Sequence, residues 1–318
     1  PPLFFFHPED GILDRSRSRG LGDVYKRQDL NIASSAVNRQ ILLLEDAIGM
    51  HLFERTGRRL ILTETGHLLL RHVQETAFGH GEVMSAIDAL RGIRSGRVRI
   101  SVVESISTAL LPGIVAGFRE CYPDIHITMT VTGSEGVADM VLERQSDVGF
   151  TFKAAQSRDL EVIYRASLRI GAVVHCHHPL AERNQVSLAE CFEHSVAYPA
   201  RSLSIRPLLD EALRAGGIRR SAAMEANSLR VMSALARNGN CVAFQTVVGI
   251  ERDLADGTLI FIPVNDKALV SNEFQLVRRS GREISPATGA FIEYATPCLR
   301  AVSYTHLRAH ETDSYLVC

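Results

Sequence analysis

Polar and basic side chains between residues 34 and 59 have the types and spacing needed to contact nucleic acid. Asn38 and Arg39 fall on the polar face of a predicted helix. Three arginines follow that helix, at Arg55, Arg58 and Arg59. Polar side chains on a helix can read the edges of bases, and a basic turn can hold phosphates. The pattern therefore predicts DNA binding, with a plain surface helix as the alternative.

A second group of polar side chains lies just before predicted helices in the later part of the chain. It comprises Ser105, Ser107, Ser134, Ser202 and Ser228. Free N–H groups and the dipole at a helix start favour an anion, often a carboxylate, and serine hydroxyls add short-range donors. Taken singly, each serine is more often a helix cap than a ligand contact. Taken together, they predict a binding cleft for a small molecule.

Two charged residues narrow the chemistry of that ligand. Arg201 could hold a carboxylate in a bidentate fork. Glu104 argues against a highly charged anion, unless it pairs with Arg201 or with an amine on the ligand. The sequence therefore favours a zwitterionic or hydroxylated small molecule that carries a carboxylate.

The run His175, Cys176, His177 and His178 offers soft ligands to a metal. His175 and His177 would share one face of a strand and could hold zinc or copper. Two histidines without a third or fourth ligand form a weak pattern, so we expect no metal and no cofactor. The sequence also contains no GxSxG elbow, no HExxH and no phosphate-binding loop, so we expect no enzyme.

Length, charge and composition limit the kind of protein that can carry these groups. The chain has 318 residues, room for two or three domains, and a net charge of -1, so any attraction to DNA must be local. Its six cysteines form no CxxC pair, which disfavours a disulfide framework or a zinc knuckle. With neither a signal peptide nor a membrane span in the sequence, we expect a reducing cytoplasm.

The DNA-contacting residues need a helix and a hairpin to position them. Apolar Val37, Ile41, Leu44 and Ile48 recur at helical spacing, and Gly49 is suited to end that helix. A strand follows at Leu60-Ile61-Leu62, which makes Thr56-Gly57 a predicted hairpin tip that carries the three arginines.

This stretch resembles the winged helix-turn-helix of LysR-type transcriptional regulators. The matching residues are Ser35-Ala36-Val37, Arg39-Gln40-Ile41, Leu44-Glu45, Gly49, Leu52-Phe53-Glu54-Arg55 and Leu62-Thr63-Glu64-Thr65-Gly66. By this resemblance the recognition helix contacts DNA through Ser34, Ser35, Asn38, Arg39 and Gln40, and the wing does so through Arg55, Arg58 and Arg59. Leu42 and Leu43 stand where the family often carries basic residues, which predicts fewer phosphate contacts.

The resemblance implies four further features. Residues 29–66 would be a partial winged helix-turn-helix, because the helix that braces the recognition helix has no counterpart in the sequence. Residues 63–95, capped by Thr63, would be a linker helix that pairs two subunits through its long apolar stripe. Residues 97–301 would be a two-lobe effector domain like a periplasmic binding protein. Residues 1–28 and 303–318 look like translated sequencing-adaptor DNA and are expected to be non-native.

The pattern after residue 97 supports the two-lobe interpretation. Strand and helix signals alternate, which predicts an α/β fold with mainly parallel sheets. By the resemblance, the chain would cross between lobes near Thr151–Ala155 and again near Val270–Phe274. Ser105, Ser134 and Ser202 best match family positions that line the cleft between the lobes.

These features predict a DNA-binding regulator controlled by a small-molecule effector. The resemblance implies a homodimer or homotetramer on promoter DNA, with effector binding shifting the lobes and changing contact with RNA polymerase. The alternative is a solute-binding module that binds DNA poorly, because the bracing helix is missing from the pattern. A hydrolase on the same scaffold is a third possibility, but no nucleophile-and-base pair supports it.

Overall fold

The computed structural model describes residues 34–56, 59–90, 95–152, 157–218, 222–239, 241–266, 269, 272–281 and 284–308. Two compact units divide the chain between Val83 and Met84. Within the described residues, every helix is too short or too polar to span a membrane. The segment 1–28, expected to be non-native, lies outside them. The last helix reaches Arg308 and so enters segment 303–318, whose origin stays a prediction.

The first unit contains the predicted helix and hairpin. Helix α2 (Ser34–Ile48) is followed by Gly49, whose φ of +73° lies in the left-handed region that disfavours residues with a side chain. Strands β1 (Phe53–Thr56) and β2 (Arg59–Leu62) pair antiparallel, as predicted, with Thr56 opposite Arg59. Thr56 therefore belongs to β1 rather than to the tip, and residues 57 and 58 lie outside the described part.

Two side chains fix how these elements join. The Glu45 carboxylate in α2 accepts hydrogen bonds from the backbone N–H groups of Leu52 (2.7 Å) and Phe53 (3.1 Å). Those bonds, the one from Leu52 above all, hold the pKa of Glu45 below its usual range. The Thr63 hydroxyl accepts from the N–H of Gly66 at 3.0 Å and donates to the His51 carbonyl at 2.7 Å. It thus caps the following helix, as predicted from the sequence.

That helix, α3 (Glu64–Leu90), carries exposed apolar side chains along its length. Leu68 and Val83 are each 57% exposed, and Val73 and Met84 are also exposed. A surface helix normally buries such a stripe against its neighbours. Of the stripe predicted from the sequence, Val73, Val83 and Met84 are exposed and Leu69, Leu70 and Ile87 are half-buried, while subunit pairing through it stays a prediction.

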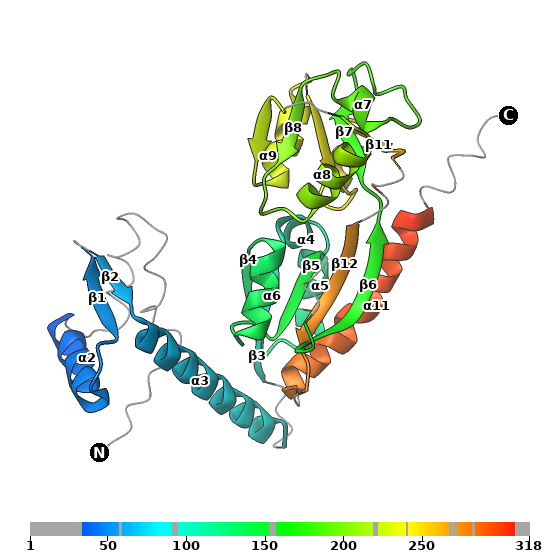
Figure 1. Ribbon diagram of the computed structural model, residues 1–318. Coiled ribbons are helices and arrows are strands. Elements are labelled where there is room, and N and C mark those ends of the chain that lie inside the picture. The colour runs from blue at the N-terminus through cyan, green and yellow to red at the C-terminus, as the bar shows by residue number, and fades with distance from the viewer. Residues whose placement is uncertain are drawn as a thin grey trace. The chain divides into compact units, whose positions relative to one another are not determined.

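The second unit consists of two lobes, each built on a five-stranded sheet (Figure 1). In lobe 1 the strand order is β4-β3-β5-β12-β6. Its elements are β3 (Gly96–Val102), α4 (Glu104–Thr108), α5 (Leu111–Cys121), β4 (Ile125–Val131), α6 (Ser134–Leu142), β5 (Val148–Phe152), β6 (Leu160–Leu168), β12 (Asn272–Arg279) and α11 (Pro286–Arg308).

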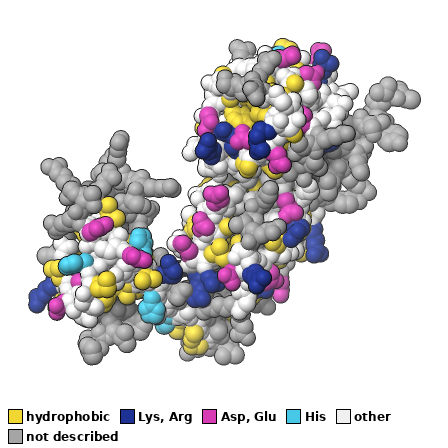
Figure 2. Space-filling view, viewed as in Figure 1, with side chains coloured by type: hydrophobic (Ala, Val, Ile, Leu, Met, Phe, Trp, Pro, Cys, Tyr) yellow, Lys and Arg dark blue, Asp and Glu magenta, His cyan; other side chains and the backbone are white. Residues whose placement is uncertain are grey.

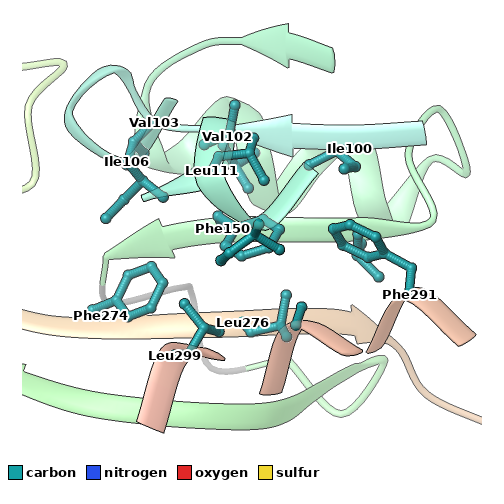
Figure 3. Close-up of a cluster of buried hydrophobic side chains, with 14 of the residues drawn as sticks. Ile100, Val102, Val103, Ile106, Leu111, Phe150, Phe274, Leu276, Phe291 and Leu299 are labelled. Carbon is teal, nitrogen blue, oxygen red and sulfur yellow. The ribbon is translucent and has the colours of Figure 1, made fainter. Parts of the chain in front are cut away.

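Aromatic side chains hold the layers of lobe 1 together (Figure 3). Phe118 of α5 meets Phe291 of α11 edge to face, with ring centroids 5.2 Å apart. Phe150 of β5 stacks with Phe274 of β12 at 6.4 Å and also meets Phe291 at 6.3 Å. Helices α5 and α11 therefore share a core with the sheet. Such aromatic pairs each contribute about 0.5–1.5 kcal/mol beyond the area they bury.

Lobe 2 has the strand order β11-β7-β10-β8-β9. Alternate residues of its central strand serve two cores, Val242 and Phe244 on one face and Ala243 on the other. Both faces are covered by helices, which explains the continuous apolar runs in its strands. Its elements are β7 (Gly171–His175), α7 (Leu188–Cys191), β8 (Val196–Pro199), α8 (Ile205–Ala215), β9 (Met224–Ala226), α9 (Leu229–Arg237), β10 (Val242–Gln245), α10 (Glu251–Ala255) and β11 (Leu259–Pro263).

Two expectations about this unit are corrected. The sheets are not mainly parallel: each has two parallel and two antiparallel pairings. The first crossing between lobes is also not at Thr151–Ala155. The chain first adds β6 to lobe 1 and crosses at residues 169 and 170, because β6 pairs with β12 at the sheet edge. The second crossing, just before Asn272, falls where it was predicted.

Candidate functional site: a cleft between lobes and a DNA-contacting helix

The predicted serine-rich turns meet where the two lobes face each other. Strands β3, β4 and β5 run parallel, so the turns that follow them lie along one edge of lobe 1. Strands β8, β9 and β10 are likewise parallel in lobe 2. Ligands in open α/β sheets bind beyond the carboxyl ends of the strands. The two sets of turns therefore form the candidate effector site.

Glu104 joins the two lobes across this cleft through two hydrogen bonds. Its carboxylate, at the start of α4 in lobe 1, accepts the Ser228 hydroxyl at 2.8 Å and the Leu229 N–H at 2.8 Å. Ser228 is the N-cap of α9 in lobe 2, and its hydroxyl also accepts from the Val231 N–H. The carboxylate thus occupies a helix N-terminus, where negative charge is favoured. The suggested Glu104–Arg201 pair is not what holds this carboxylate.

Ser105 lies beside Glu104 and is only 4% exposed. Its hydroxyl oxygen is buried and has no hydrogen-bond partner among the described residues. Gly249 of lobe 2 approaches closely, since a Cβ added there would lie 3.2 Å from the Ser105 Cβ. Buried hydroxyl groups normally have partners, so Ser105 is a strong candidate for a ligand contact.

The lobes also approach each other at Gly133 and Ser202. Gly133 is the N-cap of α6, and a Cβ added there would lie 3.0 Å from the Ser202 carbonyl oxygen. The next residue, Ser134, is half-buried, and its carbonyl accepts the Thr151 hydroxyl at 3.2 Å. The structure therefore brings predicted Ser134 and Ser202 to the same part of the cleft.

The remaining predicted residues are placed less centrally. The Ser107 hydroxyl donates to the Glu104 carbonyl at 2.7 Å, a bond within its own helical turn. Arg201 is exposed at the rim. Asn272, which sequence reasoning missed, is buried at the second crossing and donates to the Ser204 hydroxyl at 3.1 Å. Its side-chain Oδ1 has no partner among the described residues, and no motif in the sequence distinguishes this asparagine from other polar residues of the strand NEFQLVRR.

Arg206 is a second residue that the sequence did not single out. Its guanidinium donates to Asp210 (2.9 Å), to the Pro199 carbonyl (2.8 Å) and to Glu225 (3.0 Å), and lies over the Tyr198 ring. Figure 2 shows acidic and basic side chains side by side on the visible face of lobe 2. These hydrogen bonds join β8, β9 and α8, so Arg206 stabilises the elements of lobe 2 that carry turns of the cleft.

The predicted DNA-contacting residues lie at the start of α2 and in the hairpin. Asn38, Arg39 and Gln40 are all exposed there, while α2 itself begins with Ser34 and Ser35. Arg55 and Arg59 lie on β1 and β2, and Arg58 lies outside the described residues. The neighbouring Leu42 and Leu43 are 63% and 55% exposed, so apolar side chains occupy the adjacent surface.

Comparison with known proteins identifies both parts. The family described as "LysR substrate binding domain" matches residues 91–297, and "Bacterial regulatory helix-turn-helix protein, lysR family" matches residues 28–67. The chain is 27% identical over 274 residues to the probable RuBisCO transcriptional regulator of Synechocystis sp., covering 84% of this chain and 79% of that one.

Two solved structures share the fold. CbnR, a LysR family transcriptional regulator, matches with a TM-score of 0.62 and 16% identity over 86% of this chain and 93% of its own. The regulatory domain of Synechocystis PCC6803 CcmR, solved in complex with 2-PG, matches with a TM-score of 0.58 and 14% identity over 63% of this chain and 96% of its own. The fold expected from the sequence is confirmed. The chain belongs to the LysR family of transcriptional regulators, with a helix-turn-helix region followed by an effector-binding domain of two lobes.

Proposed function

We propose that this regulator binds promoter DNA through the start of α2 and the β1–β2 wing, and senses a carboxylate-bearing small molecule between its lobes. It acts by binding rather than by catalysis, as the regulators it matches do. The exposed apolar stripe of α3 supports pairing of subunits into a homodimer or homotetramer. Its place of action is the cytoplasm, where promoter DNA and RNA polymerase are found.

The contact between Glu104 and α9 is the main support for proposing a carboxylate ligand. That contact already binds a carboxylate, with one hydroxyl and one backbone N–H as donors. An effector carboxylate has the same oxygen geometry and can replace the Glu104 side chain there. The buried Ser105 hydroxyl, together with Ser134 and Ser202 where Gly133 approaches the second lobe, supplies polar contacts for the rest of the ligand. The CcmR regulatory domain was solved in complex with 2-PG, which supports the proposal that a small molecule binds the domain of the same fold in this chain.

Displacement of the Glu104 carboxylate from α9 would allow the effector to change the relative arrangement of the two lobes. A ligand shifts a conformational equilibrium only by its different affinities for the two states. With the effector on α9, the bond that now joins lobe 1 to lobe 2 at Glu104 would be broken and new bonds through the ligand would form. The resulting change in lobe geometry is transmitted to the DNA-bound subunits and to RNA polymerase.

Thermal melting of the full chain against small carboxylates, amino acids and aromatic acids tests the effector half of this proposal. A ligand at a hundredfold over its dissociation constant should stabilise the protein by about 2.7 kcal/mol. Ser228→Ala should reduce that gain, while Ser157→Ala, in the loop before β6, should not. A hit that is unaffected by Ser228→Ala would place the ligand elsewhere and overturn the α9 assignment.

Selection from a randomised pool of duplex DNA, followed by binding measured against salt, tests the DNA half. Specific binding should weaken as salt rises, with a slope set by the number of phosphates contacted. Arg39→Ala should reduce discrimination by about 1–3 kcal/mol if Arg39 reads a base. The control Arg71→Ala removes an exposed arginine of α3 and should leave discrimination unchanged. No enrichment from the pool, combined with an effector hit, would favour the alternative of a solute-binding module.

A further inference from the structure

Three metal-ligating side chains stand in succession at the end of β7. One ligand atom each from His175, Cys176 and His177 can be chosen so that all lie within 4.8 Å of one another. The His175 Nδ1 is 3.8 Å from the Cys176 sulfur, and the rings of His175 and His177 are 5.1 Å apart. The sequence predicted that the two histidines share a face. The structure adds the cysteine as a third donor on the same side.

The backbone holds this triplet in a fixed turn. His175 is paired with Leu259 in the sheet, and the Cys176 N–H donates to the Thr258 carbonyl at 3.1 Å. The His178 N–H then closes the turn on the His175 carbonyl at 2.9 Å. Ligands fixed by the backbone lose less freedom on binding a metal, which favours a site. His178 itself is buried and accepts the Leu180 N–H on its Nδ1, so it supports the turn rather than joining the triplet.

We propose that His175, Cys176 and His177 bind one zinc ion, with water or another exogenous ligand in the fourth position. One thiolate and two imidazoles are a ligand set that zinc prefers, and binding releases the thiol proton. Tetrahedral zinc, with bonds of about 2.3 Å to sulfur and about 2.0–2.1 Å to nitrogen, brings its donors to roughly 3.3–3.6 Å of each other. His177 is exposed and Cys176 half-buried, so small side-chain rotations can close the present spacing.

One existing hydrogen bond must be given up when zinc binds His175. The His177 N–H donates to the His175 Nδ1 at 3.2 Å. Zinc on Nδ1 replaces that donor directly, and zinc on the other ring nitrogen places the imidazole proton on Nδ1, which can then no longer accept the His177 N–H. Either choice keeps the imidazole neutral, as a metal ligand must be.

The zinc site is separate from the effector cleft. β7 runs antiparallel to β10, so the carboxyl end of β7 lies at the opposite edge of the sheet from the carboxyl end of β10. Gly249, which approaches Ser105 in the cleft, follows β10. Zinc at His175–His177 should therefore leave effector affinity unchanged. The proposal does not depend on the effector assignment, and either can fail alone.

Cobalt substitution tests the site on the intact chain. After removal of metals with a chelator, Co²⁺ should give a thiolate-to-cobalt charge-transfer band at one ion per chain, and Zn²⁺ but not Mg²⁺ should abolish the band. Cys176→Ser should lose the band. His177→Ala should weaken Co²⁺ binding by more than about tenfold, since even indirect partners of a metal site matter by that much.

Matched controls remove a cysteine and a histidine from elsewhere on the surface. Cys121→Ser and His126→Ala replace exposed residues of lobe 1 and should leave the band and the affinity unchanged. Thermal melting of each variant confirms that it is folded. A wild-type chain without the band, or a band that persists in Cys176→Ser, overturns the proposal.

Discussion

At the scale of single residues, carboxylates that accept backbone N–H groups join one element to another. Glu104 accepts the Leu229 N–H, Glu45 accepts those of Leu52 and Phe53, and Asp266 accepts the Leu188 N–H at 2.8 Å. Hydrogen bonds to an ionised acceptor are roughly twice as strong as neutral ones. Each such bond also satisfies a backbone group that a helix start or turn leaves open. These few residues therefore set how neighbouring elements are oriented.

Glu104→Gln should strengthen binding of a carboxylate effector. The neutral amide competes less well than a carboxylate for the N-terminus of α9, so the effector displaces it more easily. We expect about a tenfold lower dissociation constant, equivalent to about 1.4 kcal/mol, for the acid that stabilises the wild type. Titration calorimetry gives the comparison. Glu135→Gln, exposed in the first turn of α6, is the control, and equal affinities in wild type and Glu104→Gln would contradict displacement.

Glu45→Gln should remove a pH dependence from the first unit. Because the folded pKa of Glu45 is lowered, its contribution to stability is fully present above the ordinary carboxyl pKa of 4.5 and is lost as the pH falls through the lowered value. The melting temperature of the wild type should therefore fall more steeply, as the pH is lowered, than the melting temperature of the variant. Circular dichroism scans between about pH 7 and pH 3 measure both. Parallel curves for the two proteins would show that Glu45 does not contribute in this way.

At the scale of elements, sequence patterns located most strands and helices but not every one. β5 (Val148–Phe152) is recognisable in the sequence, because a wholly buried strand is a short run without charged residues. β6 was missed since it mixes charged Glu161 and Arg165 with apolar residues on an edge strand. The first crossing was misplaced for the same reason. Element type followed from local pattern, whereas the position of an edge strand depends on a partner more than a hundred residues away.

Gly66→Ala should destabilise the junction between the wing and α3. A Cβ there would lie 2.2 Å from the Leu52 carbonyl oxygen and 2.8 Å from a Leu62 methyl, so the backbone must shift. Overpacking of this kind costs about 1–3 kcal/mol. Gly289→Ala in α11 is the control, because its nearest neighbour would be 3.5 Å away. Chemical denaturation of both variants tests this, and a Gly66→Ala protein as stable as the control would show that the contact relaxes without cost.

At the scale of the whole second unit, polar contacts and the apolar side chains of Val247 and Val248 join the lobes. Val248 of lobe 2 packs into the core of lobe 1, and Glu104, Gly133 and Ser105 meet lobe 2 from the other side. The sequence predicted a ligand site at serine-bearing turns, and several of those turns lie where the lobes meet; ligand binding there stays a prediction. It could not show that Glu104 reaches α9, because the two are 125 residues apart and meet only through the crossing of the chain. Contacts between lobes are therefore the least predictable part of the site.

Gly133→Ala should weaken effector binding by changing how closely the lobes approach. The added Cβ would lie 3.0 Å from the Ser202 carbonyl oxygen, closer than an ordinary contact, so that part of the cleft must widen. The backbone of Gly133, at φ −73° and ψ 167°, accepts alanine without strain, so lobe 1 itself should keep its stability. If the competent arrangement becomes less populated, the apparent dissociation constant rises by the inverse of that fraction.

Gly113→Ala supplies the matched comparison for this variant. It adds the same methyl group to α5, where no atom lies within 4 Å, and should change stability only slightly in the favourable direction. Effector titrations of the two variants then separate cleft geometry from general stability. A Gly133→Ala protein that melts like Gly113→Ala but binds effector more weakly would show that the approach of the lobes controls affinity. Equal affinity in both would mean that Ser202 moves aside freely and that Glu104 alone links effector binding to the lobes.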